Sequence, residues 1–153
     1  AYWSSDAGRT ALQRTGDYVE DSVRPIFDAG LADLVPADHR IDAAIALVHT
    51  PGHTPGHVCV AIDSEGQHAL ITGDVLHHPL QCRFPHWSTR FCFDPEQSRA
   101  TRLAFMQQHA GQQTLLFPAH FPDPTAGRLR RVQTSESTHY VYDFVAHDRA
   151  GAA

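Results

Sequence analysis

The sequence contains no lysine, since its 12 basic residues are all arginine, and its 17 acidic residues give a formal net charge of −5. A nucleic-acid binder needs a concentrated basic face to neutralise phosphates. The run RLRR at 128–131 is too short to form such a face, and we interpret it as a solvated strand or loop. We therefore expect no nucleic-acid partner.

Long apolar runs are also absent. The longest run near the middle of the chain covers residues 43–48, far below the roughly 20 residues that span a bilayer. The three cysteines, Cys59, Cys82 and Cys92, are odd in number and lack C-x-x-C spacing, so the sequence indicates neither a disulfide framework nor a thiolate zinc site. We expect a soluble, cytoplasmic protein with no membrane partner. The chain starts with neither Met nor a signal sequence, which favours a processed or truncated product.

The sequence is rich in apolar residues and in histidine. Apolar residues make up 42% of the 153 positions and charged residues 19%, which is enough for the core of one domain. No repeat or linker divides the chain, so we expect residues 1–153 to form a single domain. The 12 histidines equal the arginines in number, and this surplus hints at metal binding.

The sequence predicts two helices. After Asp17, apolar residues at helical intervals predict one buried helical face, with a kink or a break at Pro25 and an end at Gly30. The apolar residues of this face are Val19, Val23, Ile26 and Phe27. A second helix is predicted from Asp94, as the N-cap before a proline, to about His109.

Short segments rich in Val, Ile and Leu predict strands between and after these helices. A hairpin should join two of them around residues 64–66. The predicted strands cover residues 44–48, 57–63, 68–72, 115–118 and 138–145. This order of elements indicates a layered α/β or α+β domain.

A residue type that binds metals directly follows a predicted strand at three places. His53 lies between two Pro-Gly turns in TPGHTPGH, Asp74 ends Thr-Gly-Asp, and His120 ends Phe-Pro-Ala-His. Imidazole and carboxylate are ligands that zinc prefers when thiolates are absent. A single residue of this kind is more often a hydrogen-bonded turn or cap residue than a ligand. Their shared position at strand ends favours a metal site.

The run TPGHTPGHV, then ITGDVL and later FPAHFP resemble the later motifs of the metallo-β-lactamase-fold hydrolases over residues 40–128. This resemblance implies a four-layer αββα sandwich with a metal site at one edge of its two sheets. By motif, His53 corresponds to a ligand of a first metal, Asp74 to the carboxylate that bridges two metals, and His120 to a ligand of the second. His57 matches a structural histidine outside the ligand set.

The signature H-x-H-x-D-H of this family, which precedes these motifs, does not occur in the 153 residues. We therefore expect a single partial domain that lacks the N-terminal part of the sandwich. Two divalent ions are expected as cofactors, with zinc first and iron or manganese as alternatives. Whether this chain alone binds both ions and is active stays open.

The resemblance implies hydrolysis of a small molecule by a metal-activated hydroxide. Two divalent cations about 3.5–4 Å apart lower the pKa of a shared water towards neutrality, and Asp74, as the catalytic carboxylate, offsets their repulsion. The expected substrate is an ester, lactone, thioester or phosphoester. HHPLQ and AHFPDPTAGR resemble the lactonase-like and methyl parathion hydrolase-like branch of the family.

The long aromatic loop after Asp74 is the candidate wall of the substrate pocket. His77, Trp87 and Phe91 are its candidate pocket residues, and His77 could donate a hydrogen bond to a developing oxyanion. The alternative is that the aromatic residues simply pack the loop onto the core. These residues are Phe84, Trp87, Phe91 and Phe93.

Two further functions stay open. A non-catalytic remnant or assembly module of the same fold would cover its bare sheet face with a partner chain or as a homodimer. A large exposed apolar patch would favour that function. An iron-dependent oxidoreductase would use the same ligands, and metal analysis would separate it from the hydrolase.

Overall fold

The computed structural model describes residues 2–3, 5–16, 18–135 and 137–146. The chain divides into two compact units, residues 1–36 and residues 37–153. Within the described residues, no helix is both long enough and apolar enough to cross a membrane.

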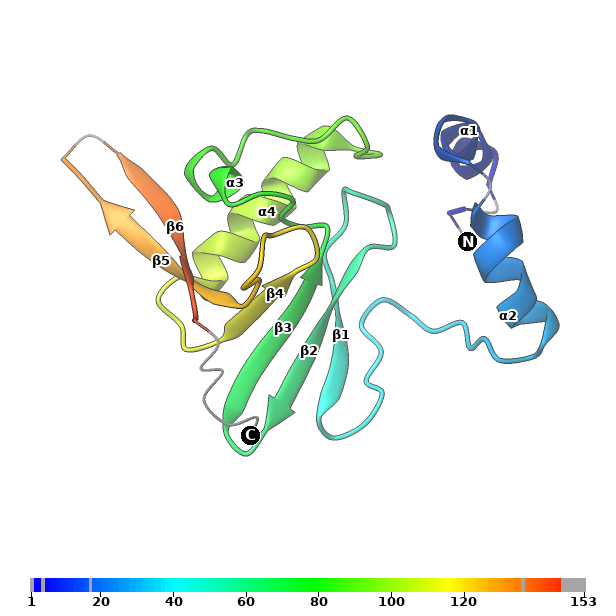
Figure 1. The fold of residues 1–153 in the computed structure, drawn as a ribbon, viewed down its shortest axis with the longest axis horizontal. Helices are drawn as coiled ribbons and strands as arrows, with labels where there is room; N and C mark the ends of the chain where they lie inside the picture. Colours follow the sequence, from blue (N-terminus) through cyan, green and yellow to red (C-terminus); the bar gives the residue numbers. More distant parts are fainter. Residues whose placement is uncertain (1, 4, 17, 136, 147–153) are drawn as a thin grey trace. The chain divides into compact units, whose positions relative to one another are not determined.

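The first unit is helical (Figure 1). Helix α1, Asp6–Thr15, begins where the Ser5 hydroxyl accepts a hydrogen bond from the Gly8 N–H at 3.2 Å. The π-helix η1, Val19–Val23, and helix α2, Arg24–Asp28, then follow one another. Sequence analysis did not predict α1.

No break occurs at Pro25: the helical path continues from η1 into α2 and changes from π-helix to α-helix at Arg24, so that this proline stands in the first turn of α2. The predicted burial of the apolar face is wrong: Ile26 and Phe27 are 46% and 47% exposed. Helical spacing alone cannot show whether another element covers the face. Gly30 follows the helix with a positive φ of 68°, as expected of a terminating glycine. Asp17, the predicted start, lies outside the described residues.

The second unit contains one six-stranded sheet whose order follows the sequence (Figure 1). Among the described strands, only the pairing of β3 with β4 is parallel; all the other neighbours are antiparallel. Consequently β1, β3 and β4 run in the same direction, with β2 opposed to them. The strands are β1 Ile45–His49, β2 Val58–Ser64, β3 Gln67–Gly73, β4 Leu115–Pro118, β5 Gly127–Gln133 and β6 Thr138–Phe144.

The five predicted strands are confirmed, and so is the hairpin between β2 and β3. Glu65 and Gly66 form its turn with positive φ angles, which the glycine adopts without strain. Strand β5 contains the run RLRR, and its Arg130 pairs with Asp143 of β6 at 2.8 Å. The solvated strand is thus the correct alternative for that run.

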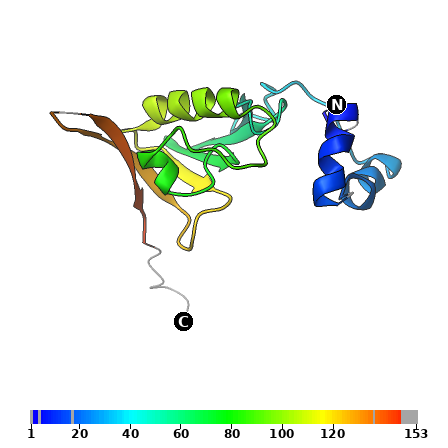
Figure 2. The ribbon, with the colours of Figure 1, turned by 90° about the horizontal axis from the view of Figure 1, so that it is seen from above.

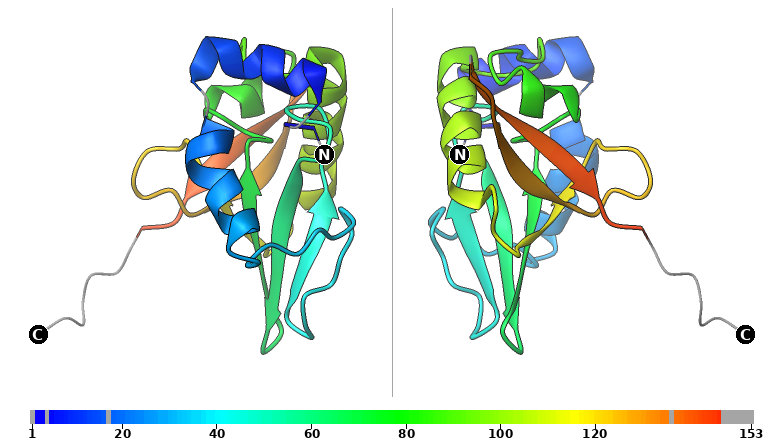
Figure 3. Two further views of the ribbon diagram at one scale, coloured as in Figure 1. Left: turned by 90° about the vertical axis from the view of Figure 1, so that its right-hand side faces the viewer. Right: turned by 90° about the vertical axis from the view of Figure 1, so that its left-hand side faces the viewer.

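Helix α4, Pro95–His109, begins where the Asp94 carboxylate accepts the Gln97 N–H at 2.9 Å, as predicted. This helix covers one face of the sheet (Figures 2 and 3). The short helix α3, Leu80–Arg83, lies in the loop after β3 and was not predicted. The core comprises Cys59, Leu70, Val75, Leu76, Cys82, Phe105, Met106, Leu116, Phe121, Leu129, Tyr140 and Tyr142.

The opposite face of the sheet is also apolar. Because side chains alternate along a strand, the register that turns Leu70 and Thr72 towards α4 turns Ile71 to the other side, where it is 46% exposed. Val60 of β2 is the register partner of Ile71 and shares its face. The predicted α/β class is confirmed, and the described residues form one of the two sheets that a four-layer sandwich contains.

Candidate metal centre

The sheet topology explains why three distant residues meet. His53 lies in the loop after β1, Asp74 directly follows β3, and His120 follows β4 after one residue. Because these three strands run in the same direction, their carboxyl ends share one edge of the sheet. The structure therefore brings together the three residues that the motifs singled out.

Asp74 lies between the two imidazoles. Its Oδ2 lies 2.9 Å from Nε2 of His53, and its Oδ1 lies 2.9 Å from Nε2 of His120. The His53 side chain is 16% exposed, whereas that of His120 is 52% exposed. Each oxygen of the carboxylate is thus directed to a different ring, with one side of the group open to solvent.

The contact between His53 and Asp74 shifts the pKa values of both groups. The hydrogen bond to Asp74 raises the pKa of His53 from 6.5 to about 9. The same hydrogen bond holds the pKa of Asp74 well below its ordinary value, although burial opposes this shift. In the metal-free chain, His53 is therefore a cation and Asp74 an anion at neutral pH.

His57 holds the main chain of Asp74 in place. Its Nδ1 lies 3.0 Å from the Thr50 carbonyl oxygen and 2.8 Å from the Thr50 hydroxyl, and its Nε2 accepts the Asp74 backbone N–H at 2.9 Å. Burial lowers the pKa of His57 and so favours the neutral ring that this acceptor role needs. Gly73 lies so close that a Cβ there would be 2.8 Å from Nε2 of His57. Both ring nitrogens of His57 face protein groups.

The turn that carries His53 is held against the start of α4. The Phe93 N–H donates to the His53 carbonyl oxygen at 2.9 Å, and the Asp94 N–H donates to the Gly52 carbonyl oxygen at 3.0 Å. Gly52 has a φ of 128°, and a Cβ there would lie 2.3 Å from the Ser98 backbone nitrogen. Glycine is required at this close approach.

His77 joins the same cluster. Its ring centroid lies 5.0 Å from those of His53 and His120, and its ring is parallel to that of His120 within 6°. One ligand atom each from His53, Asp74 and His77 lies within 4.8 Å of the other two, close enough to hold a metal ion. His77 was predicted from the sequence as a residue of the substrate pocket and not as a neighbour of the ligands.

Burial lowers the pKa of His77 to about 4, so the ring is neutral at neutral pH. Its Nδ1 is buried and has no hydrogen-bond partner among the described residues. A buried polar atom without a partner is unfavourable, and a metal ion or a substrate atom would remove that cost. The donor set at this edge therefore fits a divalent ion.

The loop that carries His77 is fixed by two buried side chains that sequence analysis missed. Gln81 accepts the His77 backbone N–H at 2.7 Å and donates to the Trp87 carbonyl oxygen at 2.9 Å. Arg102 of α4 is fully buried and donates to the carbonyl oxygens of Val75, Pro85 and Trp87 at 2.7–2.9 Å. No sequence motif marks either residue, and the three carbonyl partners of Arg102 lie 15–27 positions away along the chain.

The aromatic pocket candidates lie on the surface. Trp87 is half exposed and stacks on Phe84, with ring centroids 4.8 Å apart. Phe91 is exposed, with the Arg90 guanidinium 4.9 Å from its ring centroid. Trp87, Phe91 and Phe93 therefore do not pack the loop onto the core.

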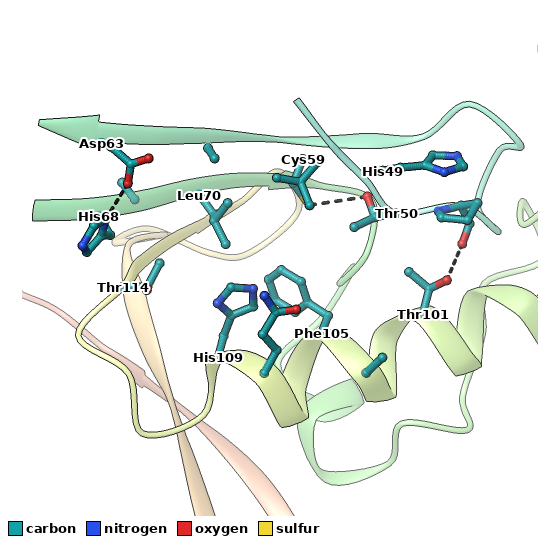
Figure 4. Close-up of a pocket in the computed structure, with 16 residues that line it drawn as sticks. His49, Thr50, Cys59, Asp63, His68, Leu70, Thr101, Phe105, His109 and Thr114 are labelled. Atoms are coloured by element: carbon teal, nitrogen blue, oxygen red, sulfur yellow. Dashed lines mark hydrogen bonds and ion pairs between the residues drawn. The ribbon is translucent and has the colours of Figure 1, made fainter. Parts of the chain in front are cut away.

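A separate cavity of about 440 Å³ runs between α4 and strands β1 to β3 (Figure 4). Thr101 and Phe105 of α4 face it from one side, and Cys59 and Leu70 of the sheet from the other. The residues of the metal cluster are not part of its lining. This cavity belongs to the interface between the sheet and the helix.

Solved structures with similar folds include the hydrolase AbOPH of the beta-lactamase superfamily and AidC, a dizinc quorum-quenching lactonase in complex with a homoserine product. AbOPH is 18% identical with a TM-score of 0.83 over 96% of this chain, and AidC is 18% identical with a TM-score of 0.69 over 89%. The chain spans 52% and 47% of their lengths. These likenesses show the fold.

Among curated proteins, an N-acyl homoserine lactonase from Bacillus sp is 31% identical over 55 residues, which are 36% of this chain and 21% of the lactonase. The profile of the metallo-beta-lactamase superfamily matches residues 1–124. The match includes all three loops that place His53, Asp74 and His120 at one edge of the sheet. This chain belongs to the metallo-beta-lactamase superfamily.

Proposed function

We propose that this chain carries part of the metal site of a metal-dependent hydrolase, with Asp74 as the carboxylate shared between two divalent ions. The observation that carries the proposal is the 2.9 Å distance from each Asp74 oxygen to a different imidazole, one of His53 and one of His120. A carboxylate with one oxygen on each side can hold two cations at a fixed separation and offset their repulsion. Imidazole and carboxylate suit zinc, and also iron or manganese.

The residues of the site have separate tasks in this proposal. A divalent ion bound here would lower the pKa of a coordinated water and polarise a carbonyl or phosphoryl oxygen. His53, Asp74 and His120 would hold the ions, and His57 keeps the main chain of Asp74 in place. His77, neutral at neutral pH, donates a hydrogen bond to the substrate oxygen on which negative charge develops.

The proposed substrate is a small molecule with an ester, lactone, thioester or phosphoester bond. The lactonases among the similar proteins make a lactone the first substrate to test. Trp87 and Phe91 are half exposed or more and are proposed to contact the apolar part of that substrate. Neither side chain needs a position in the core for this role.

We further propose that the apolar sheet face opposite α4 packs against a second sheet, which completes the four layers. The exposure of Ile71 and the register of its neighbours support this. The chain spans about half of AbOPH, so the further metal ligands are proposed to come with that second sheet. If a partner chain or a second copy supplied it without catalysis, this chain would be an assembly module.

Zinc binding and lactone hydrolysis test the proposed function. We would measure zinc affinity by competition with a chromophoric chelator and hydrolysis of an N-acyl homoserine lactone, for the wild type and Asp74→Asn. Asp63→Asn is the matched control, because Asp63 forms an exposed pair with His68 at 2.5 Å. We expect Asp74→Asn to weaken zinc binding by about 100-fold or more, since even partners of ligands contribute 10–100-fold.

The outcomes separate the alternatives. Equal zinc binding by the wild type and Asp74→Asn would contradict the proposed site. Tight zinc binding without hydrolysis, together with dimer formation, would favour the assembly module. Elemental analysis that finds iron, with redox activity, would favour the oxidoreductase.

A further inference from the structure

Cys92 differs from the other two cysteines in its surroundings. Cys59 and Cys82 are 0% and 1% exposed in the core, whereas Cys92 is only partly buried and lies two residues before the N-cap of α4. No metal-ligand motif includes Cys92, and the proposed ligand set does not use it. Its thiol nevertheless contacts that set directly.

The sulfur of Cys92 lies 3.8 Å from Nδ1 of His53, on the side of the ring opposite the Asp74 contact. The thiol donates to the Ser98 hydroxyl at 3.5 Å, which leaves sulfur lone pairs for the His53 N–H. Ser98 is itself held by the Arg102 guanidinium at 3.1 Å. A chain of contacts thus runs from buried Arg102 through Ser98 and Cys92 to His53.

We propose that Cys92 is a positioning residue for His53, whose ring it orients so that Nε2 is presented to the metal. This inference rests on the proposed function, in which His53 is a ligand. A histidine ligand commonly donates its other ring N–H to an outer partner, which fixes the ring orientation and the tautomer. Usually that partner is a carboxylate, a carbonyl group or water, and here it is a thiol.

The turn that carries His53 is attached to α4 by backbone hydrogen bonds and does not depend on the Cys92 thiol. The hydrogen bonds of Phe93 to His53 and of Asp94 to Gly52 are both between backbone groups. Removal of the Cys92 sulfur therefore leaves the turn attached to α4 and frees only the ring. A substitution of Cys92 therefore tests the orientation of the His53 ring more than the folding of the chain.

Zinc affinity of the full chain is the first readout. Loss of an outer partner of a metal ligand typically costs 10–100-fold in affinity, so we expect Cys92→Ala to bind zinc 10–100-fold more weakly. Cys92→Ser keeps an acceptor and should recover part of this loss. Cys82→Ala, which removes a thiol from the core, is the control and should bind zinc as the wild type does.

The second readout needs no metal. Nuclear magnetic resonance of the imidazole nitrogens in the metal-free chain should show an Nδ1–H of His53 that exchanges slowly with solvent in the wild type and Cys82→Ala. The same signal should be lost in Cys92→Ala. An unchanged signal together with unchanged zinc affinity in Cys92→Ala would overturn the inference. If the wild type binds no zinc, the proposed function fails, and the imidazole signal still decides whether Cys92 orients His53.

Discussion

Nε2 of His57 accepts the backbone N–H of Asp74 at 2.9 Å, so that one imidazole links the loop after β1 to the end of β3. The other ring nitrogen contacts Thr50. His57 thereby fixes the main chain on which the central carboxylate stands. This contact is a structural support for the metal site.

Substitution of His57 by alanine should therefore lower both stability and zinc affinity. The Asp74 N–H would lose its acceptor in a partly buried position, which costs about 1–3 kcal/mol. Urea denaturation of His57→Ala should report a fall in the free energy of unfolding of this size. His49→Ala, at the exposed last residue of β1, should change it less, by about 0.5 kcal/mol, because its ring contacts the Pro55 carbonyl oxygen at 3.0 Å in an exposed position. Equal effects of the two substitutions would contradict the supporting role of His57.

The pair of His53 and Asp74 should make the stability of the metal-free chain depend on pH. The pKa of His53 is raised from 6.5 to about 9, so its contribution is complete below pH 6.5 and is lost as the pH rises through about 9. The pKa of Asp74 is lowered, so its contribution is present above its ordinary pKa of 3.8 and is lost only in stronger acid. We expect the free energy of unfolding to fall between pH 6.5 and 9.

Urea denaturation at steps across that pH window measures the fall. Asp74→Asn should flatten the pH dependence, because His53 then loses the partner that raises its pKa. Asp63→Asn, in the exposed pair with His68, should leave the dependence as it is. A fall of the same size in Asp74→Asn would show that the pair is not its source.

Zinc binding should release a proton from His53. Its pKa of about 9 keeps the imidazole protonated at neutral pH, whereas a metal ligand must be deprotonated. The zinc affinity should therefore rise by about tenfold per pH unit between pH 7 and 8.5. Calorimetry in two buffers with different ionisation enthalpies counts the released protons. The same zinc affinity at both ends of this range would argue against His53 as a ligand.

Arg102 should be among the most sensitive positions outside the site. Its guanidinium donates to three loop carbonyl groups and to Ser98 in a fully buried position. Arg102→Leu would leave these acceptors unpaired, and we expect a loss of about 3 kcal/mol or more in unfolding free energy. Arg99→Leu, at an exposed arginine of the same helix, is the control. Urea denaturation that ranks the two variants equally would contradict this assignment.

The elements that the sequence predicted well are those with local signals. Asp94 and Pro95 marked the start of α4 because capping and proline geometry act within one turn. The strand segments were found from their apolar residues, and the alignment of β1, β3 and β4 then placed His53, Asp74 and His120 together. Their grouping at strand ends could be anticipated because each ligand lies within a few residues of the end of a strand.

The features that sequence analysis missed depend on distant partners. The orientation of Cys92 towards His53 joins residues 39 positions apart, and nothing near Cys92 in the sequence indicates that contact. The helical face at 19–27 was expected to be buried, but amphipathic spacing carries no information on which element would cover it. Strand β5 was left undecided because its arginines are compatible with a loop as well as with a sheet edge.

Strand β2 separates β1 from β3 in the sheet and contributes no residue to the metal cluster. Neighbouring strands lie about 4.7–4.9 Å apart, so β1 and β3 are roughly 9–10 Å from one another. His53 meets Asp74 only because the segment from Thr50 to His57 folds back across the end of β2, closed by the Thr50 N–H to the His57 carbonyl oxygen at 2.9 Å. Surface loops usually tolerate insertions and deletions, but the length of this one is fixed by the span that it must cross.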